Sequence, residues 1–196
     1  MSELTATTEA SQQETKAEFG FWVYIMTDCV LFAVLFATFA VLRNNTFGGP
    51  SGRELFSLPY VLGETLLLLA SSFTCGLAMV ALRAGNKKIL LWLLAATFVL
   101  GAGFLGMELR EFHRLAVEGN SWRRSGFLSS YFVLVGTHGL HITAGLVWLG
   151  VMVPKIVRRG LPATIHRRLT LFSLFWHFLD VVWIFIFSIV YLVGAV

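Results

Sequence analysis

Two ionisable side chains lie within an almost wholly apolar stretch near the C-terminus. The stretch reads FWHFLDVVW and continues as IFIFSIVYLVGAV to the last residue. Ser173, His177 and Asp180 follow the spacing i, i+4 and i+7, which places them on one face of a helix. There the Asp180 carboxylate could hold the tautomer of the His177 imidazole or share its charge. Hydrolase chemistry is disfavoured, because three residues stacked on one helix cannot easily aim a nucleophile and no G-x-S-x-G sequence is present.

A second stretch, GTHGLHITAG, contains His138 and His141 three residues apart. Such a pair faces one way on a helix and could bind a metal, or one member could ligate a haem iron with His177 opposite. The alternative is that neutral imidazoles bridge neighbouring helices by hydrogen bonds. Close packing of those helices would then use the small residues Gly136, Gly139, Ala144 and Gly145.

Acidic residues form a further group of candidates. Asp28 lies in MTDCVLF, Glu64 follows shortly after Tyr60, and Glu108 and Glu111 lie in GMELREFH. A carboxylate at the depth of Asp28 would be a proton-relay element or a helix-bonding group. The other three lie near the ends of apolar segments, where an interfacial network with Arg110 and His113 explains them.

The composition predicts that these residues are held by membrane-spanning helices. The 196 residues are 57% hydrophobic and only 13% charged, with a mean hydropathy of +0.76. About 20 helical residues cross a hydrocarbon core of about 30 Å. Five apolar windows reach that length, and none alternates as a membrane strand would. We therefore expect an all-α integral membrane bundle of five helices at about residues 21–42, 60–82, 89–109, 127–153 and 171–193.

The segments outside the windows predict the domain boundaries and the orientation. Residues 1–18 are polar and carry no signal-peptide pattern, so we expect a flexible tail before a membrane domain at 19–196. Nine of the fifteen Lys and Arg residues lie in the tail and in the second and fourth loops. Because basic residues collect on the cytoplasmic side, we expect the N-terminus to be cytoplasmic and the C-terminus periplasmic.

Four stretches carry a resemblance to a known family. FGFWVYIMTDCVLF, GAGFLGMELREFHRL, SGFLSSYFVLVGTHGLHITAG and FWHFLDVVW resemble subunit III of the haem-copper respiratory oxidases, and within it the quinol-oxidising, cytochrome bo-type branch of bacterial inner membranes. The resemblance extends from about residue 19 to 196. The combination of G-T-H-G-L-H with W-H-F-x-D-V-V-W in consecutive windows is specific, whereas either motif alone would only be suggestive.

The resemblance implies a division of labour between subunits. Subunit I would hold the haems and copper and pump protons, while this chain would contain no catalytic residue, no metal ligand and no cofactor. It would pack against subunit I in a complex that also contains subunits II and IV. It would also bind phospholipid in a cleft between its helices and support proton uptake. The headgroup candidates are Arg110, His113 and Arg114.

The resemblance also assigns the polar residues. Asp28 falls where the family has a buried carboxylate, which is usually Glu in the cytochrome c-oxidising members. The remaining matches are the E-x-x-E pair Glu108 and Glu111, the paired histidines His138 and His141, and the W-H-F-x-D pair His177 and Asp180. None of them is a metal ligand in the family. We expect His177 and Asp180 to pair with each other or with a facing helix.

The expected function is that of a non-redox accessory subunit of a proton-pumping terminal oxidase in the bacterial inner membrane. Its neighbouring subunit would couple ubiquinol oxidation to the reduction of dioxygen to water. Two alternatives remain from the sequence: a five-helix accessory protein of nitric oxide reduction, and an independent membrane cytochrome with two histidine ligands. Co-purification and a haem spectrum of the isolated chain would separate the three.

Overall fold

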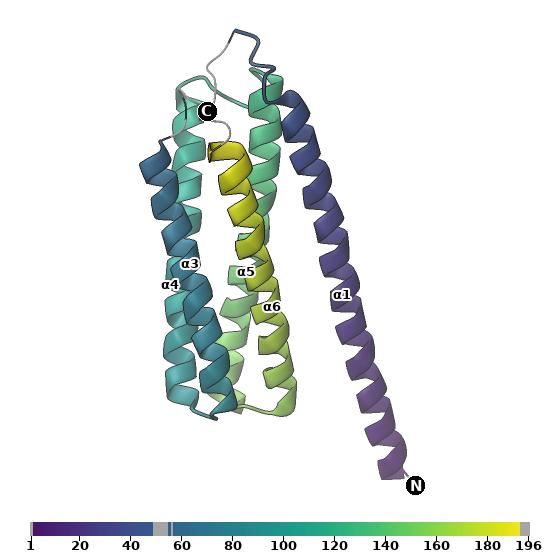
Figure 1. Ribbon diagram of the computed structural model, residues 1–196. Helices are drawn as coiled ribbons and strands as arrows, with labels where there is room; N and C mark the ends of the chain where they lie inside the picture. Colours follow the sequence, from purple (N-terminus) through teal and green to yellow (C-terminus); the bar gives the residue numbers. More distant parts are fainter. Residues whose placement is uncertain (1, 49–54, 56, 193–196) are drawn as a thin grey trace. The chain divides into compact units, whose positions relative to one another are not determined.

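The computed structural model describes residues 2–48, 55 and 57–192, and these residues form helices joined by short turns (Figure 1). The helices are α1 (Ser2–Leu42), α3 (Leu58–Arg83), α4 (Lys87–Val117), α5 (Gly126–Arg159), α6 (Ala163–Ile186) and the π-helix η1 (Phe187–Leu192). The prediction of an all-helical chain with five long apolar helices is confirmed. The segments long and apolar enough to cross a membrane are Glu18–Leu42, Leu58–Arg83, Lys87–Val117, Gly126–Arg158 and Ala163–Leu192.

The chain divides into two compact units, Met1–Val34 and Leu35–Val196. The first unit consists of the larger part of α1, which begins at Ser2 and so includes the segment expected to be a tail. The second unit contains the last turns of α1 and all the later helices. Residues 49–54, in the first loop, and residue 193, at the end of the fifth expected window, lie outside the described residues.

Four helices of the second unit form a bundle in which each helix has two neighbours. α3 contacts α4 and α6, and α5 contacts the same two helices; Figure 1 shows the four side by side. The connections span only residues 84–86, 118–125 and 160–162, so consecutive helices run antiparallel. The start of α3, the end of α4, the start of α5 and the end of α6 therefore lie at the same end of the bundle.

Local sequence signals explain where these helices begin and end. The side chain of Asn86 accepts a hydrogen bond from the backbone N–H of Ile89 at 3.2 Å and caps α4. Ser125 caps α5 by accepting from Leu128 N–H at 3.1 Å. Gly85, directly after the C-cap of α3, has φ 69°, a left-handed conformation that glycine adopts without strain.

Polar residues distribute unequally between the two ends of the bundle. We call the end where α4 finishes and α5 begins the acidic end, because it holds Glu64, Glu108 and Glu111. We call the opposite end the basic end. Its cationic side chains are Arg83, Lys87, Lys88, Lys155, Arg158, Arg167 and Arg168.

Candidate functional site

Trp176 connects α6 to the other three helices of the bundle. Its indole N–H donates to the Ser71 hydroxyl of α3 at 3.2 Å, and its side chain is almost completely buried. The ring lies against Gly101 of α4 and Gly145 of α5. A Cβ at either glycine would lie 2.8 Å from a ring carbon. Only the absence of a side chain at both glycines allows the ring to occupy this place.

Trp183 makes a second set of connections two turns further along α6. Its indole N–H donates to the Thr65 hydroxyl of α3 at 3.0 Å. Its ring meets Phe104 of α4 edge-on at 4.6 Å between centroids, and stacks on His138 of α5 at 5.3 Å. Trp176 and Trp183 together fix the rotation of α6 within the bundle.

The acidic end contains a cluster of three buried carboxylates, which we call the acid cluster: Glu64 of α3, and Glu108 and Glu111 of α4. Their exposed fractions are 0%, 2% and 3%, and they lie close enough to interact electrostatically. All four carboxylate oxygens of Glu64 and Glu108 lack a hydrogen-bond partner within the described residues. Glu108 lies over Gly139 of α5, where a Cβ would be 2.7 Å from its Oε1.

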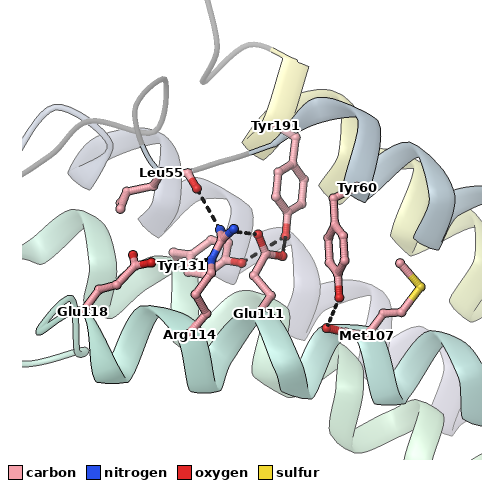
Figure 2. Close-up of polar contacts among 8 residues, drawn as sticks. All are labelled: Leu55, Tyr60, Met107, Glu111, Arg114, Glu118, Tyr131 and Tyr191. Carbon is pink, nitrogen blue, oxygen red and sulfur yellow. Dashed lines mark hydrogen bonds and ion pairs between the residues drawn. The ribbon is translucent and has the colours of Figure 1, made fainter.

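Glu111 is the member of the cluster with partners (Figure 2). Its Oε2 accepts from the Tyr191 hydroxyl at 3.5 Å, and its Oε1 lies 3.7 Å from a guanidinium nitrogen of Arg114. The Tyr131 hydroxyl lies 3.0 Å from that of Tyr191. Next to this network, Tyr60 donates to the carbonyl of Met107 at 2.9 Å.

The acid cluster would be costly to hold with all three carboxyl groups ionised. Three negative charges enclosed by apolar residues would cost far more than the half-exposed guanidinium of Arg114 offsets. Carboxyl groups that share protons avoid that cost. No group of three His, Cys, Asp or Glu side chains within the described ranges has the arrangement of a metal site.

The two histidines of GTHGLH have different surroundings. His138 is fully buried, with Phe104 edge-on to its ring at 5.9 Å and Trp183 stacked on it. His141 is half-buried, and its Nδ1 lies 2.7 Å from the carbonyl of Thr137 one turn earlier. The two rings interact electrostatically but differ in burial and in the groups that surround them.

His177 and Asp180 lie at the edge of α6 that faces α3, outside the aromatic core. The Nδ1 of His177 donates to the carbonyl of Ser173 at 2.7 Å, and the His177 side chain is exposed. Asp180 accepts a hydrogen bond from Ser72 of α3 and interacts electrostatically with His177. A pair of haem ligands formed by His138 and His177 does not fit this arrangement, because their rings contact different helices.

The remaining predicted residues lie elsewhere. Asp28 belongs to the first unit, where it forms a side-chain hydrogen bond with Tyr24 one turn earlier. Among the headgroup candidates, Arg110 and His113 are exposed. Arg114 donates to the carbonyl of Leu55 at 3.0 Å as well as facing Glu111, so its guanidinium is partly committed within the chain.

Comparison with known proteins assigns the fold to a family. Residues 3–195 match the family model described as "Cytochrome c oxidase subunit III". The chain belongs to this family. The match covers nearly the whole chain, so the residues described above are parts of a subunit III.

Three relatives illustrate the range of oxidases. Cytochrome bo(3) ubiquinol oxidase subunit 3 of Pseudomonas aeruginosa is 58% identical over 90% of this chain and 85% of its own length. Quinol oxidase subunit 3 of Bacillus subtilis is 47% identical over 89% of this chain and 86% of its own length. Cytochrome c oxidase subunit 3 of Bacillus sp. strain PS3 is 45% identical over 90% and 86%. The predicted family and membrane location are confirmed.

Sequence reasoning about this subunit III missed its aromatic residues. Trp176 and Trp183 belong to the motif FWHFLDVVW, but the motif alone predicts no packing role for them. Their spacing of seven residues puts them on one helical face. Tyr131 and Tyr191 were not considered either, although both hydroxyls are buried beside Glu111. Tyr60, near the start of the second window, donates a hydrogen bond to the Met107 carbonyl of α4. The sequence signal for this packing is a pair of aromatic residues seven positions apart on one helix, together with glycines within the neighbouring helices.

Proposed function

We propose that the chain is the non-redox accessory subunit III of a proton-pumping terminal oxidase that oxidises ubiquinol and reduces dioxygen to water. The redox chemistry would take place in subunit I, which would hold the haems and copper. The chain itself would stabilise that subunit and support its proton uptake. Members of the family generally carry no redox centre, which agrees with this assignment.

The observation that carries the proposal is the length and degree of the match to quinol oxidase subunits. Two Pseudomonas subunits named as parts of a cytochrome bo(3) ubiquinol oxidase are 58% and 56% identical over 90% of the chain. The cytochrome c oxidase relative is 45% identical over a similar length. The larger identity favours quinol as the electron donor of the complex.

The packing of the bundle supports a scaffolding role. Its core between α3, α4, α5 and α6 is filled by Trp176, Trp183 and Phe104, all with 1% exposure or less. The buried ring of His138 is held between two of these aromatic groups. A core filled in this way positions helix surfaces for neighbouring subunits.

The proposal includes the partners and the orientation predicted from the sequence. Subunit I would be a direct partner, with subunits II and IV in the same complex, and phospholipid would bind at the surface with Arg110 and His113 as headgroup contacts. The basic end would face the cytoplasm, as the positive-inside rule requires. The N-terminus would then be cytoplasmic and the C-terminus periplasmic.

Purification of the tagged chain from native membranes tests the proposed function. We expect a haem-copper subunit to co-purify and the preparation to oxidise ubiquinol with consumption of dioxygen. The chain expressed without its partners should give a flat reduced-minus-oxidised haem spectrum. Absence of any haem-copper subunit, or a b-type haem band in the isolated chain, would contradict the proposal.

Cytochrome c oxidation is the second candidate, because one relative is named a cytochrome c oxidase subunit 3. The same preparation separates the two donors when it is supplied with reduced cytochrome c or with ubiquinol. Turnover with cytochrome c alone would favour this second candidate.

A further inference from the structure

A mainly apolar groove that includes several polar side chains runs between α3 and α6 on the outside of the helical bundle. Two adjoining hollows of about 520 and 380 Å³ form it, and both include Gly76 and His177. The smaller hollow is also lined by Ser72 and Asp180. The larger hollow continues past Ser173 to the basic end. We call this feature the α3–α6 groove.

The polar residues of the groove lie within the apolar part of the membrane-spanning segment. α6 and η1 form one candidate span, Ala163–Leu192, whose first turns carry Arg167 and Arg168. From residue 171, where the apolar window begins, His177 lies about 9 Å and Asp180 about 14 Å along the helix at 1.5 Å per residue. The groove therefore presents an imidazole and a carboxylate at a depth where a lipid bilayer offers only hydrocarbon.

The chain satisfies only part of the hydrogen-bonding capacity of these two side chains. The Ser173 carbonyl can only accept, so the His177 Nδ1 carries a proton, and in the tautomer protonated only there Nε2 is an acceptor. Nε2 is directed over Gly76, 3.8 Å from where a Cβ would lie. The Oδ1 of Asp180 has no hydrogen-bond partner among the residues that the structure describes. Both open positions require a donor.

The residues that line the groove favour a helix over an acyl chain as the occupant. Ser72 and Gly76 are small residues four positions apart on α3, and such spacing lets another helix approach closely. An acyl chain contains no hydrogen-bond donor, so it would leave Nε2 and Oδ1 in hydrocarbon, which is costly. A helix with a donor side chain at this depth would satisfy both groups.

We propose that the α3–α6 groove is a docking site for a transmembrane helix of a neighbouring subunit, which donates hydrogen bonds to His177 and Asp180. This inference rests on the proposed function, because it takes the neighbour from the oxidase complex. The donor is an amide, hydroxyl or basic side chain. A lipid, a second copy of the chain and the segment 2–34 of the same chain are the competing occupants.

Site-specific photocrosslinking in the intact complex identifies the occupant. A benzoylphenylalanine replaces Phe73, which lines the groove and is 68% exposed, and in a matched control it replaces Phe98, which is 40% exposed on α4. The tagged complex is irradiated in native membranes, purified and digested. Mass spectrometry should find an adduct with a transmembrane peptide of another oxidase subunit at position 73 and not at 98.

A second pair of variants tests whether the groove itself is needed. Gly76→Leu places a large side chain beside His177, while Gly106→Leu, at an exposed glycine of α4 with nothing within 4 Å of its added Cβ, is the control. We expect loss of the adduct at position 73 in the first variant and retention in the second. Loss of the adduct in both variants, or in neither, would contradict docking in the groove.

The outcomes separate this inference from the proposed function. If haem-copper subunits co-purify but position 73 yields only lipid, a second copy or residues 2–34, the groove is not the docking site and the proposed function stands. If no other oxidase subunit co-purifies, both proposals fail. An adduct with another subunit at 73 and at 98 alike would also overturn a specific site.

Discussion

At the scale of single residues, two glycines determine where Trp176 lies. A Cβ at Gly101 or Gly145 would be 2.8 Å from its ring, a separation that real Cβ atoms do not adopt. The ring is rigid and enclosed, so it cannot move aside as a flexible side chain would. The indole hydrogen bond from Trp176 to Ser71 therefore depends on Gly101 and Gly145, because these glycines leave room for the ring.

Gly145→Ala should therefore destabilise the protein by about 1–3 kcal/mol, the usual range for overpacking a filled core. Gly150→Ala is the matched control on the same helix, because its added Cβ would meet nothing closer than 4.0 Å. The control should be neutral or slightly stabilising, since alanine favours helix more than glycine does. Unfolding of the two purified variants in detergent measures the difference; equal stabilities would contradict the assigned packing.

The sequence predicted close packing at the glycine-rich stretch but not the partners of its glycines. Gly139 lies against the Glu108 carboxylate and Gly145 against Trp176. Sequence spacing places each glycine on a helical face, but the side chain opposite it depends on how α4, α5 and α6 are rotated against each other. The contact between Glu111 and Arg114 is easier to predict from the sequence, because the two residues are three positions apart on one helix.

At the scale of elements, α6 has an aromatic face that packs in the core and a polar edge that borders the groove. Trp176 and Trp183 hold the face toward the core, with hydrogen bonds to Ser71 and Thr65 of α3. Asp180 lies outside this aromatic face and accepts from Ser72, also of α3. The aromatic contacts position the helix, and Asp180 adds a polar contact at the rim of the groove.

Asp180→Ala should leave the haem spectrum of the complex unchanged but loosen this subunit from it. The reason is that Ser72 loses its acceptor and the groove loses the Asp180 carboxylate, while the proposed function places the redox centres in another chain. Retention of the subunit after detergent washing measures the effect. Ser188→Ala is the control, because the Ser188 hydroxyl, in η1, donates to the Ile184 carbonyl near the end of α6 at 2.8 Å and lies outside the groove. Loss of haem absorbance with the subunit still attached would be the opposite result.

The helices themselves were predictable because hydrophobic length alone identifies a membrane span. The ends of the helices were harder to predict. The third window was expected to end at residue 109, whereas α4 continues to Val117. Charged residues such as Arg110 and Glu111 end a hydropathy window, yet the helix continues because Glu111 and Leu115 are buried within the bundle. Hydropathy measures transfer to lipid and does not register polar groups that are enclosed by protein.

At the scale of the whole molecule, the antiparallel bundle gathers its buried acidic residues at one end. Alternation of helix direction brings the start of α3 and the end of α4 to one end, so Glu64 joins Glu108 and Glu111 there. The same alternation collects Arg83, Lys87 and the cationic residues at the end of α5 and the start of α6 at the other end. The acidic end also carries Arg110, Arg114, Arg123 and Arg124, so it combines both signs of charge, whereas the charged residues that the structure describes at the basic end of the bundle are all cationic.

This separation predicts the orientation in the membrane. Basic residues are retained on the cytoplasmic side, so the turn after α3 should be cytoplasmic and the α4–α5 connection periplasmic. Ala84→Cys and Ser121→Cys place one thiol in each connection. In spheroplasts, a membrane-impermeant maleimide should label Ser121→Cys directly, and Ala84→Cys only after permeabilisation. The parent chain supplies the background, because it already contains a buried Cys75 and an exposed Cys29, the latter within the apolar segment of α1. The reversed pattern of labelling would contradict this orientation and place the acidic end in the cytoplasm.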